Sequence, residues 1–167
     1  MIYEIETLQL LPHSVPQVER LIQQAYENDK NLPELAGAFH TEIGPLNQVI
    51  LIRRYDNSSA ANRNSAEPLW PHQINDFVVS MRCKAFVPFA FSPEWPSGDV
   101  GPFFEMRTYM FADGELPKVA AVWEKALPAR IKASPLAAVW HSEDQHDSTM
   151  IHIWPYKSLD LRQESRK

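Results

Sequence analysis

The sequence has almost no cysteine, because Cys83 is the single one among 167 residues. This chain alone therefore forms no internal disulfide and no thiolate metal site. The residues around it, MRCKAFVPF, are largely apolar, which predicts an ordinary, partly buried thiol. No apolar run approaches the roughly 20 residues of a membrane helix, and the first residues, MIYEIETLQLL, are acidic where a signal peptide is basic. We therefore expect no membrane insertion and a cytoplasmic protein.

An excess of positive charge is also absent. The net charge is −5 and the pI is about 5.7, without a cluster of lysine and arginine. This balance argues against binding to nucleic acid or to anionic membranes. The 5 glycines form no phosphate-binding loop and no Gly-x-Ser-x-Gly elbow, so neither nucleotide binding nor nucleophilic catalysis is indicated. The chain is long enough to bury a core without disulfides.

What the sequence does contain is an internal repeat, which we infer to be a duplication. A shift of 101 positions aligns the two ends of the chain without a gap. Identical residues that coincide at this offset are Glu4 with Glu105, Thr7 with Thr108, Pro16 with Pro117, His40 with His141, and Tyr55 with Tyr156.

Each copy predicts the order β-α-β-β. Strand-like alternation marks residues 3–10, 35–42 and 48–55 in the first copy and residues 104–111, 136–143 and 149–156 in the second. Apolar residues at helical spacing follow the first strand of each copy, with Pro16 or Pro117 in the first turn. We expect Pro128 to end or kink the second helix.

The repeats predict three regions: residues 1–63 as the first β-α-β-β repeat, 64–101 as a connector, and 102–167 as the second repeat. In the middle of the chain, NSSAANRNSAE could start a helix, PHQINDFVVSMR is a second helical candidate, and KAFVPFAF predicts an edge strand. SLDLRQESRK predicts a short polar helix or a frayed tail. Helices cover one sheet face of such a unit, so two units placed face to face would close a barrel-like core.

The stretches YEIETLQL, HTEIGPLNQVI and HIWPYKSLDLR together resemble the NIPSNAP family. The resemblance covers nearly the whole chain and implies an α+β fold, with two ferredoxin-like repeats of the dimeric α+β barrel type. It transfers a fold better than a reaction. Two departures from the family pattern stand out: Glu6 replaces the arginine that Arg107 retains, and DQHDST replaces the Gly-Pro-Leu-Asn turn in the second copy.

The residues Gly44 to Asn47 specify a tight connection between two strands. Glycine has a free φ, proline fixes its own φ, and asparagine tolerates the left-handed region. We interpret this stretch as a hairpin turn first, and as a loop that contacts a ligand or partner second.

Strand alternation groups the polar residues that are candidates for a site. If the isoleucines of the last strand of each copy pack on the helices, the alternate residues point into the barrel. The candidates on that side are Glu105, Arg107, Tyr109, His141, Glu143, His152 and Trp154 in the second copy, with His40, Glu42 and Arg53 in the first.

Two interpretations of these candidates remain open. In one, Arg107 anchors a small anionic or polar ligand, Tyr109 and Trp154 line the pocket, and His141 or His152 acts as the acid or base. In the other, an ion-pair network such as Glu105–Arg107–Glu143 only stabilises the barrel.

Imidazoles and carboxylates near residues 141–152 also raise the question of a metal. Their spacing matches no defined ligand signature, so we expect no metal and no cofactor. The sequence thus predicts a barrel that binds a small polar or aromatic molecule, with cofactor-independent catalysis as a further step. The alternative is a non-catalytic interaction module. In either case we expect a homodimer or a higher homo-oligomer.

Overall fold

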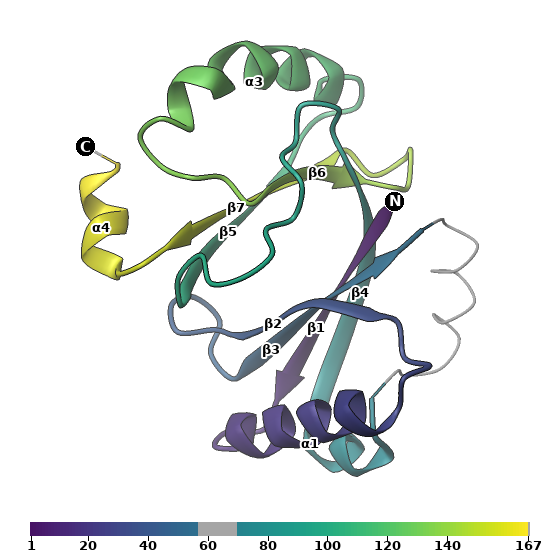
Figure 1. Ribbon diagram of the computed structural model, residues 1–167. Helices are drawn as coiled ribbons and strands as arrows, with labels where there is room; N and C mark the ends of the chain where they lie inside the picture. Colours follow the sequence, from purple (N-terminus) through teal and green to yellow (C-terminus); the bar gives the residue numbers. More distant parts are fainter. Residues whose placement is uncertain (57–69, 167) are drawn as a thin grey trace. The chain divides into compact units, whose positions relative to one another are not determined.

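The computed structural model describes residues 1–56 and 70–166 (Figure 1). The chain divides into two compact units, Met1–Phe86 and Val87–Lys167, hereafter the first and second unit. Within the described residues, no helix combines the length and the apolar character that crossing a membrane requires.

The first unit is an antiparallel sheet with one long helix. Its elements are β1 (Ile2–Leu10), α1 (Val15–Asn28), β2 (Glu34–His40), β3 (Gln48–Tyr55), the 3-10 helix η1 (His72–Phe77) and β4 (Val78–Pro88). The strands lie in the order β2-β3-β1-β4, and each neighbouring pair is antiparallel. Figure 1 shows α1 running along one face of these strands.

The second unit begins with the same four elements, β-α-β-β. Its elements are β5 (Phe103–Met110), α3 (Leu116–Arg130), β6 (Ala138–Ser142), β7 (Thr149–Tyr156) and the short helix α4 (Leu159–Glu164). The strand order is β6-β7-β5, again antiparallel. Figure 1 shows α3 on one side of this sheet and α4 following the end of β7. Both units are therefore β-α-β-β, as the sequence predicts.

Each unit packs its helix against its sheet around a core of its own. In the first unit, Val18 and Ile22 of α1 pack with Leu8, Val49 and Leu51 of the strands. In the second, Leu127 of α3 packs with a set of strand residues, with Val119 and Trp123 partly buried beside it. The strand residues of that core are Val139, Met150, Trp154 and Tyr156. Burial of such side chains contributes about 1.5–3 kcal/mol each.

The prediction of which sheet face the helices cover was wrong. Leu51 and Arg53 face α1, because Leu51 lies in the core with Val18 and Arg53 bonds to Tyr26 of the same helix. His152 likewise contacts Trp123 of α3. Alternation assigns residues to a common face but does not say which face a helix covers. Arg53 and His152 therefore lie between sheet and helix, and not on the side opposite the helices.

The Gly44–Asn47 stretch is the connection between β2 and β3, which confirms the hairpin interpretation. Gly44 has φ +111° and Asn47 has φ +57°, both in the region that these residue types tolerate. Thr41 Oγ1 donates to the carbonyl oxygen of Pro45 at 2.6 Å, and this hydrogen bond stabilises the turn.

Two predictions about helices need correction, and one cannot be judged. The helix predicted over residues 71–82 is helical only as η1, and Val78 begins β4, where Met81 pairs with Leu8 of β1. Pairing with β1 outweighs the local preference. Helix α3 continues past Pro128 to Arg130, so Pro128 does not end the helix, and the alternative of a kink stays a prediction. The helix start predicted at residues 57–67 lies outside the described residues.

Candidate functional site

The register of β5 and β7 assembles the candidate site on the sheet face that carries α3. Glu105 pairs with Trp154, Arg107 with His152, and Tyr109 with Met150. Because alternate residues of a strand share a face, all of these side chains project to the same side. The grouping of Glu105, Arg107, Tyr109, His152 and Trp154 from the sequence therefore agrees with the register.

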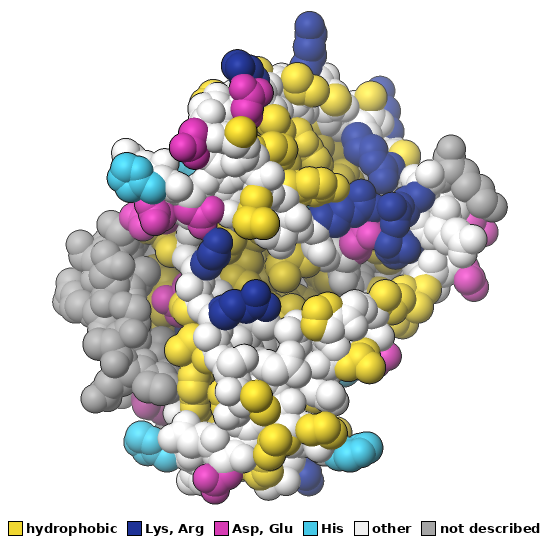
Figure 2. Space-filling view, turned by 180° about the vertical axis from the view of Figure 1, so that it is seen from behind, with side chains coloured by type: hydrophobic (Ala, Val, Ile, Leu, Met, Phe, Trp, Pro, Cys, Tyr) yellow, Lys and Arg dark blue, Asp and Glu magenta, His cyan; other side chains and the backbone are white. Residues whose placement is uncertain are grey.

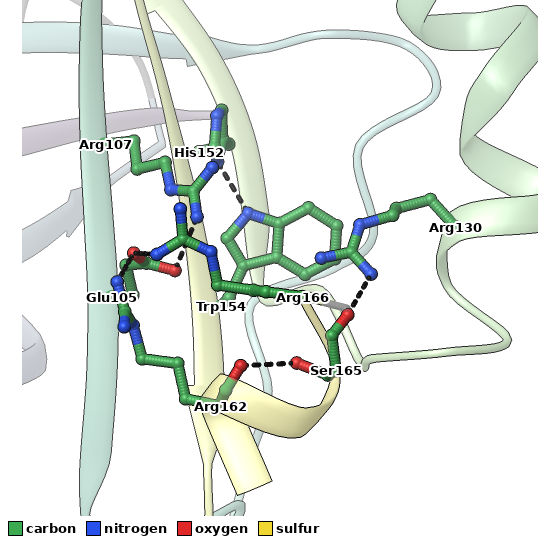
Figure 3. Close-up of polar contacts among 8 residues, drawn as sticks. All are labelled: Glu105, Arg107, Arg130, His152, Trp154, Arg162, Ser165 and Arg166. Carbon is green, nitrogen blue, oxygen red and sulfur yellow. Dashed lines mark hydrogen bonds and ion pairs between the residues drawn. The ribbon is translucent and has the colours of Figure 1, made fainter. Parts of the chain in front are cut away.

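Glu105 is the centre of an arginine cluster (Figure 3). Its Oε2 accepts a hydrogen bond from Nη2 of Arg107 at 3.0 Å. Its Oε1 accepts from Nη1 of Arg166 at 3.3 Å and also from Nη2 of Arg162. Partial burial opposes ionisation of this carboxyl group, but the hydrogen bonds from Arg162 and Arg107 outweigh it and lower the pKa of Glu105.

His152 is buried beside this cluster and is bonded to Trp154. The indole Nε1 of Trp154 donates to Nδ1 of His152 at 2.6 Å (Figure 3). Burial, helped by the positive charge of Arg107, lowers the pKa of His152 to about 4. The imidazole is therefore neutral at pH 7, with Nδ1 as acceptor and the proton on Nε2.

Aromatic rings enclose the His152 imidazole. The ring of Tyr109 stacks on it with centroids 5.4 Å apart, and the ring of Trp123 from α3 is tilted against it at 4.7 Å. Arg130, the last residue of α3, places its guanidinium 5.0 Å from the ring centroid of Trp154. This is the geometry of a cation–π contact.

The short helix α4 and the turn after it contribute two of the arginines, Arg162 and Arg166. Ser158 caps the helix, because its Oγ accepts from the backbone N–H of Leu161 at 3.2 Å. Arg162 and Arg166 are four residues apart, so they project from similar sides of a helical turn. Figure 2 shows basic side chains gathered around an acidic one on the surface that carries this part of the second unit.

The structure does not bring every predicted residue to this site. His141 shares the sheet face, but its Nδ1 bonds the carbonyl oxygen of Ser142 at 2.8 Å and its ring lies against Phe89. Glu143 follows the end of β6 and is exposed. The proposed network Glu105–Arg107–Glu143 therefore exists only in its first pair, with Arg162 and Arg166 completing it.

The equivalent positions of the first unit form a different cluster. Arg53 is 1% exposed and binds Glu6 Oε2 at 2.8 Å, Glu4 Oε1 at 3.4 Å and the Tyr26 hydroxyl at 2.9 Å. Burial has the largest effect on the pKa of Glu6 and raises it, although the positive charge of Arg53 beside it acts in the opposite direction. For Arg53 the charges of Glu6 and Tyr26 outweigh burial and raise its pKa. We conclude that Arg53 stays charged and that this cluster is closed to solvent.

His40 and Glu42, the other first-unit candidates, lie at the surface. His40 is bonded to Glu19 of α1 at 2.7 Å through Nδ1 and to Glu42 at 3.2 Å through Nε2. The hydrogen bond with Glu19 raises the pKa of His40. Neither residue contacts Arg53, so the three do not form one site.

Four residues of the second-unit site were not predicted from the sequence. They are Trp123, Arg130, Arg162 and Arg166. A signal existed for Arg162 and Arg166, because their spacing places them on one side of a helix. Nothing in the local sequence indicates that the tail lies against Glu105 of β5.

A cavity of about 540 Å³ lies elsewhere, between α1 and the strands of the first unit. Its lining includes Ile22 and Tyr26 of α1, Phe39 of β2 and Val49 of β3. It contains none of the predicted site residues. In residues 1–56 and 70–166, no group of three His, Cys, Asp or Glu side chains is placed to hold a metal ion.

Comparison with known proteins identifies relatives over almost the whole chain. The NIPSNAP family model matches residues 3–93 and 104–167. A NipSnap homolog of Dictyostelium discoideum is 24% identical over 165 residues, covering 96% of this chain and 72% of the relative. NipSnap homolog 1 of Danio rerio is 22% identical over 178 residues, covering 99% of this chain. The chain spans 64% of the length of that relative.

Solved structures support the fold over the full chain. A candidate monooxygenase from Lactobacillus acidophilus has a TM-score of 0.66 at 13% identity, covering 99% of this chain and 81% of its own. A second candidate monooxygenase, from Fusobacterium nucleatum, also has a TM-score of 0.66, at 8% identity, with coverage of 99% and 79%. At these identities the likeness concerns the fold alone, which is α+β with ferredoxin-like units of the dimeric α+β barrel type.

Proposed function

The chain belongs to the NIPSNAP family, and we propose that its second unit binds a small molecule with an anionic group and a flat or aromatic part. The observation that carries this proposal is the arginine cluster on Glu105 beside the enclosed His152–Trp154 pair. Family membership assigns no reaction to this chain. The proposal therefore rests on the side chains of the site.

The anionic part of the ligand is indicated by Arg107. Its guanidinium donates to Glu105, yet its side chain is still 29% exposed. A guanidinium has five N–H donors, so this bond leaves donors for a second acceptor. Carboxylate and phosphate oxygens are the acceptors that match its planar shape.

The aromatic part is indicated by Tyr109, which is 41% exposed although its ring stacks on His152 and on Phe111. An aromatic side chain held in place by two neighbours, with surface left open, offers a platform for another ring. Arg107 lies two residues away on the same strand face. A flat molecule could therefore stack on Tyr109 while its anionic group reaches Arg107.

The geometry also limits what His152 can do in a reaction. The Trp154 indole nitrogen can only donate a hydrogen bond, so Nδ1 of His152 is the acceptor and the proton of the imidazole is on Nε2. With a pKa of about 4, the ring is neutral. We therefore assign His152 the role of a hydrogen-bond donor through Nε2 and not that of a base. In cofactor-independent chemistry, such a donor would stabilise an oxygen atom that gains negative charge.

The alternative, a non-catalytic interaction module, has some support from exposed apolar residues. Met110 at the end of β5 is 82% exposed, and Ile43 beside the β2–β3 turn is 74% exposed. Single exposed apolar side chains are common on protein surfaces. Ligand binding is the stronger proposal, because it accounts for charge, exposure and aromatic stacking at one place.

Benzoate is a suitable probe, since it combines one carboxylate with one ring. We expect it to shift the indole N–H resonances of Trp154 and Trp123 saturably in a nitrogen-15 NMR titration. Arg107→Gln should weaken this binding roughly tenfold, the value of one charge-assisted hydrogen bond. Arg54→Gln, which removes a partly exposed arginine of the first unit, is the matched control and should have no effect. Equal binding by the two variants, or no saturable shift in the wild type, would contradict the proposal.

A further inference from the structure

We propose that Arg162 of α4 and Arg166 just after it, together with Arg107 and Arg130, bind a dianionic oxyanion group, such as that of a phosphate monoester. This inference rests on the proposed function, because it names the class of ligand for the same site. The strand residues of this site were predicted from the sequence, and the inference adds arginines from the end of α3 and from the C-terminal segment that begins with α4.

The first argument is the surplus of donors around Glu105. Three guanidinium groups, those of Arg107, Arg162 and Arg166, converge on this single carboxylate. Each guanidinium has five N–H donors, whereas a carboxylate offers about four acceptor positions. Most of the donors must therefore find acceptors elsewhere, and oxyanions are the acceptors they match best.

The second argument is the balance of charge. Arg130 brings a fourth positive charge, and its Nη1 donates to the carbonyl oxygen of Ser165 at 3.2 Å (Figure 3). Four arginines thus share one ionised carboxylate. Asp160 and Glu164 lie on the same helix as Arg162, but neither has a hydrogen bond or ion pair with these arginines among the described residues. A ligand with two negative charges would compensate most of the excess.

The third argument is access. The side chains of Arg107, Arg162 and Arg166 are 29%, 30% and 42% exposed, so a molecule from solvent can reach them. Helix α4 has no buried residue. Arg162 of α4 and Arg166 after it make polar contacts with Glu105, and the Ser165 carbonyl oxygen accepts a hydrogen bond from Arg130. A ligand at this place would share these polar contacts.

The first unit provides an internal contrast. There one arginine, Arg53, faces two carboxylates, and its side chain is 1% exposed. Its Nη1 faces Glu4 and Glu6, and its Nε donates to the Tyr26 hydroxyl. That cluster has no surplus of positive charge, and a molecule from solvent cannot reach Arg53, so we expect it to bind no anion. The proposed anion site belongs to the second unit alone.

The test compares phenyl phosphate with benzoate on the full chain, by the same titration of indole resonances. The second pKa of a phosphate monoester is about 6, so phenyl phosphate is mainly dianionic at neutral pH. We expect it to bind at least about tenfold more tightly than benzoate, because additional charge-assisted hydrogen bonds form. Added salt should weaken phenyl phosphate binding more than benzoate binding.

The double variant Arg162→Gln/Arg166→Gln should remove this advantage, so that phenyl phosphate then binds no more tightly than benzoate binds to the same variant. Its control is Arg20→Gln/Arg54→Gln, which lowers the net charge equally but in the first unit. If phenyl phosphate binds no more tightly than benzoate, or if the two double variants behave alike, the inference is wrong while the proposed function stands. If neither probe binds, both are wrong.

A phosphate monoester can belong to a soluble molecule or to a lipid headgroup. Sedimentation with phosphatidylcholine vesicles, with and without phosphatidic acid, distinguishes these sources. Sedimentation that requires phosphatidic acid and is lost in Arg162→Gln/Arg166→Gln would assign the lipid. Binding of phenyl phosphate without such sedimentation would assign a soluble ligand. Sedimentation with phosphatidic acid that the double variant leaves unchanged would contradict a role for α4.

Discussion

The indole N–H of Trp154 donates a hydrogen bond to Nδ1 of His152 at 2.6 Å, in the core between β7 and α3. Since tryptophan can only donate, this bond requires an unprotonated Nδ1. Burial independently disfavours the imidazolium form, and the two effects act in the same direction. His152 is therefore a neutral donor and a poor proton acceptor.

The neutral state of His152 predicts a specific loss of stability in acid. Its folded pKa is about 4, whereas an unfolded histidine titrates near 6.5. Below about pH 6.5, His152 is therefore protonated in the unfolded chain and still neutral in the folded chain. The free energy of unfolding should fall by about 3 kcal/mol between pH 6.5 and 4 from this residue alone. His152→Gln, which keeps an acceptor for Trp154, should remove this component in urea denaturation series.

His40 supplies a control of opposite sign. Its pKa is raised by the bond with Glu19, so its contribution to stability is present below the unfolded pKa and is lost as the pH rises. His40→Gln should therefore make the protein less tolerant of acid, and His152→Gln more tolerant. Parallel pH profiles for wild type and His152→Gln would show that His152 is not held neutral.

Loss of Arg53 should destabilise the first unit strongly. Arg53→Met leaves Glu4 and Glu6 buried without their cation, an arrangement that costs about 3–5 kcal/mol. Arg54→Gln, next in sequence, breaks a partly exposed pair with Glu34 and should cost less than about 1 kcal/mol. Urea denaturation at pH 7 measures both. Similar costs for the two variants would mean that the buried pair is not maintained in solution.

Gly101 should not tolerate a side chain. It has φ +125°, and a Cβ atom would lie 2.5 Å from the carbonyl oxygen of Tyr156, at the end of β7. Because that contact is with backbone, we expect Gly101→Ala to cost more than about 2 kcal/mol. Gly98 is the control, because it has φ +90° but no atom within 4 Å of the place that an added Cβ would take, and Gly98→Ala should cost about 1 kcal/mol. Thermal unfolding that ranks the variants in the reverse order would refute the close contact.

Cys83 should react slowly despite its place at the surface. The residue is exposed on β4, which differs from the partly buried thiol that the sequence indicates. Although the side chain is exposed, desolvation by neighbouring protein atoms, followed by the charges of Glu4 and Glu6, raises the pKa of Cys83 to about 12. Alkylation by iodoacetamide at about pH 8 should be at least roughly tenfold slower than in denaturing urea. Equal rates in the two conditions would show that the carboxylates do not affect the thiol.

Local sequence was sufficient for the strands and their facing residues. The predicted bounds of β3 and β7, residues 48–55 and 149–156, agree with the structure. The common face of Glu105, Arg107, His152 and Trp154 follows the alternation in the sequence, whereas the pairing of β5 with β7 that brings them side by side was not predicted. Strand bounds and shared faces depend on neighbours within a strand or its hairpin partner, and a period of two residues encodes them directly.

The sequence predicted only some of the residues of the site. Glu105, Arg107, Tyr109, His152 and Trp154 were predicted, but the partners from helices were not. Arg130 ends α3, and Arg162 lies on α4, so each reaches the strand residues through tertiary packing. Contacts between elements far apart in sequence have no periodic signature in the chain.

The sequence by itself determined the β-α-β-β order, the two hairpins β2–β3 and β6–β7 and the set of side chains that share a face, because alternation and turn chemistry are local properties. Only the tertiary structure decided that β5 pairs with β7, that this face lies under α3, and that α4 and the turn after it bring Arg162 and Arg166 to Glu105. Both sides of β7 are apolar enough to be buried, with Ile151 and Ile153 on one and Met150 and Trp154 on the other. Which side receives the helix is therefore settled by packing over the whole unit and not by the residues of one strand.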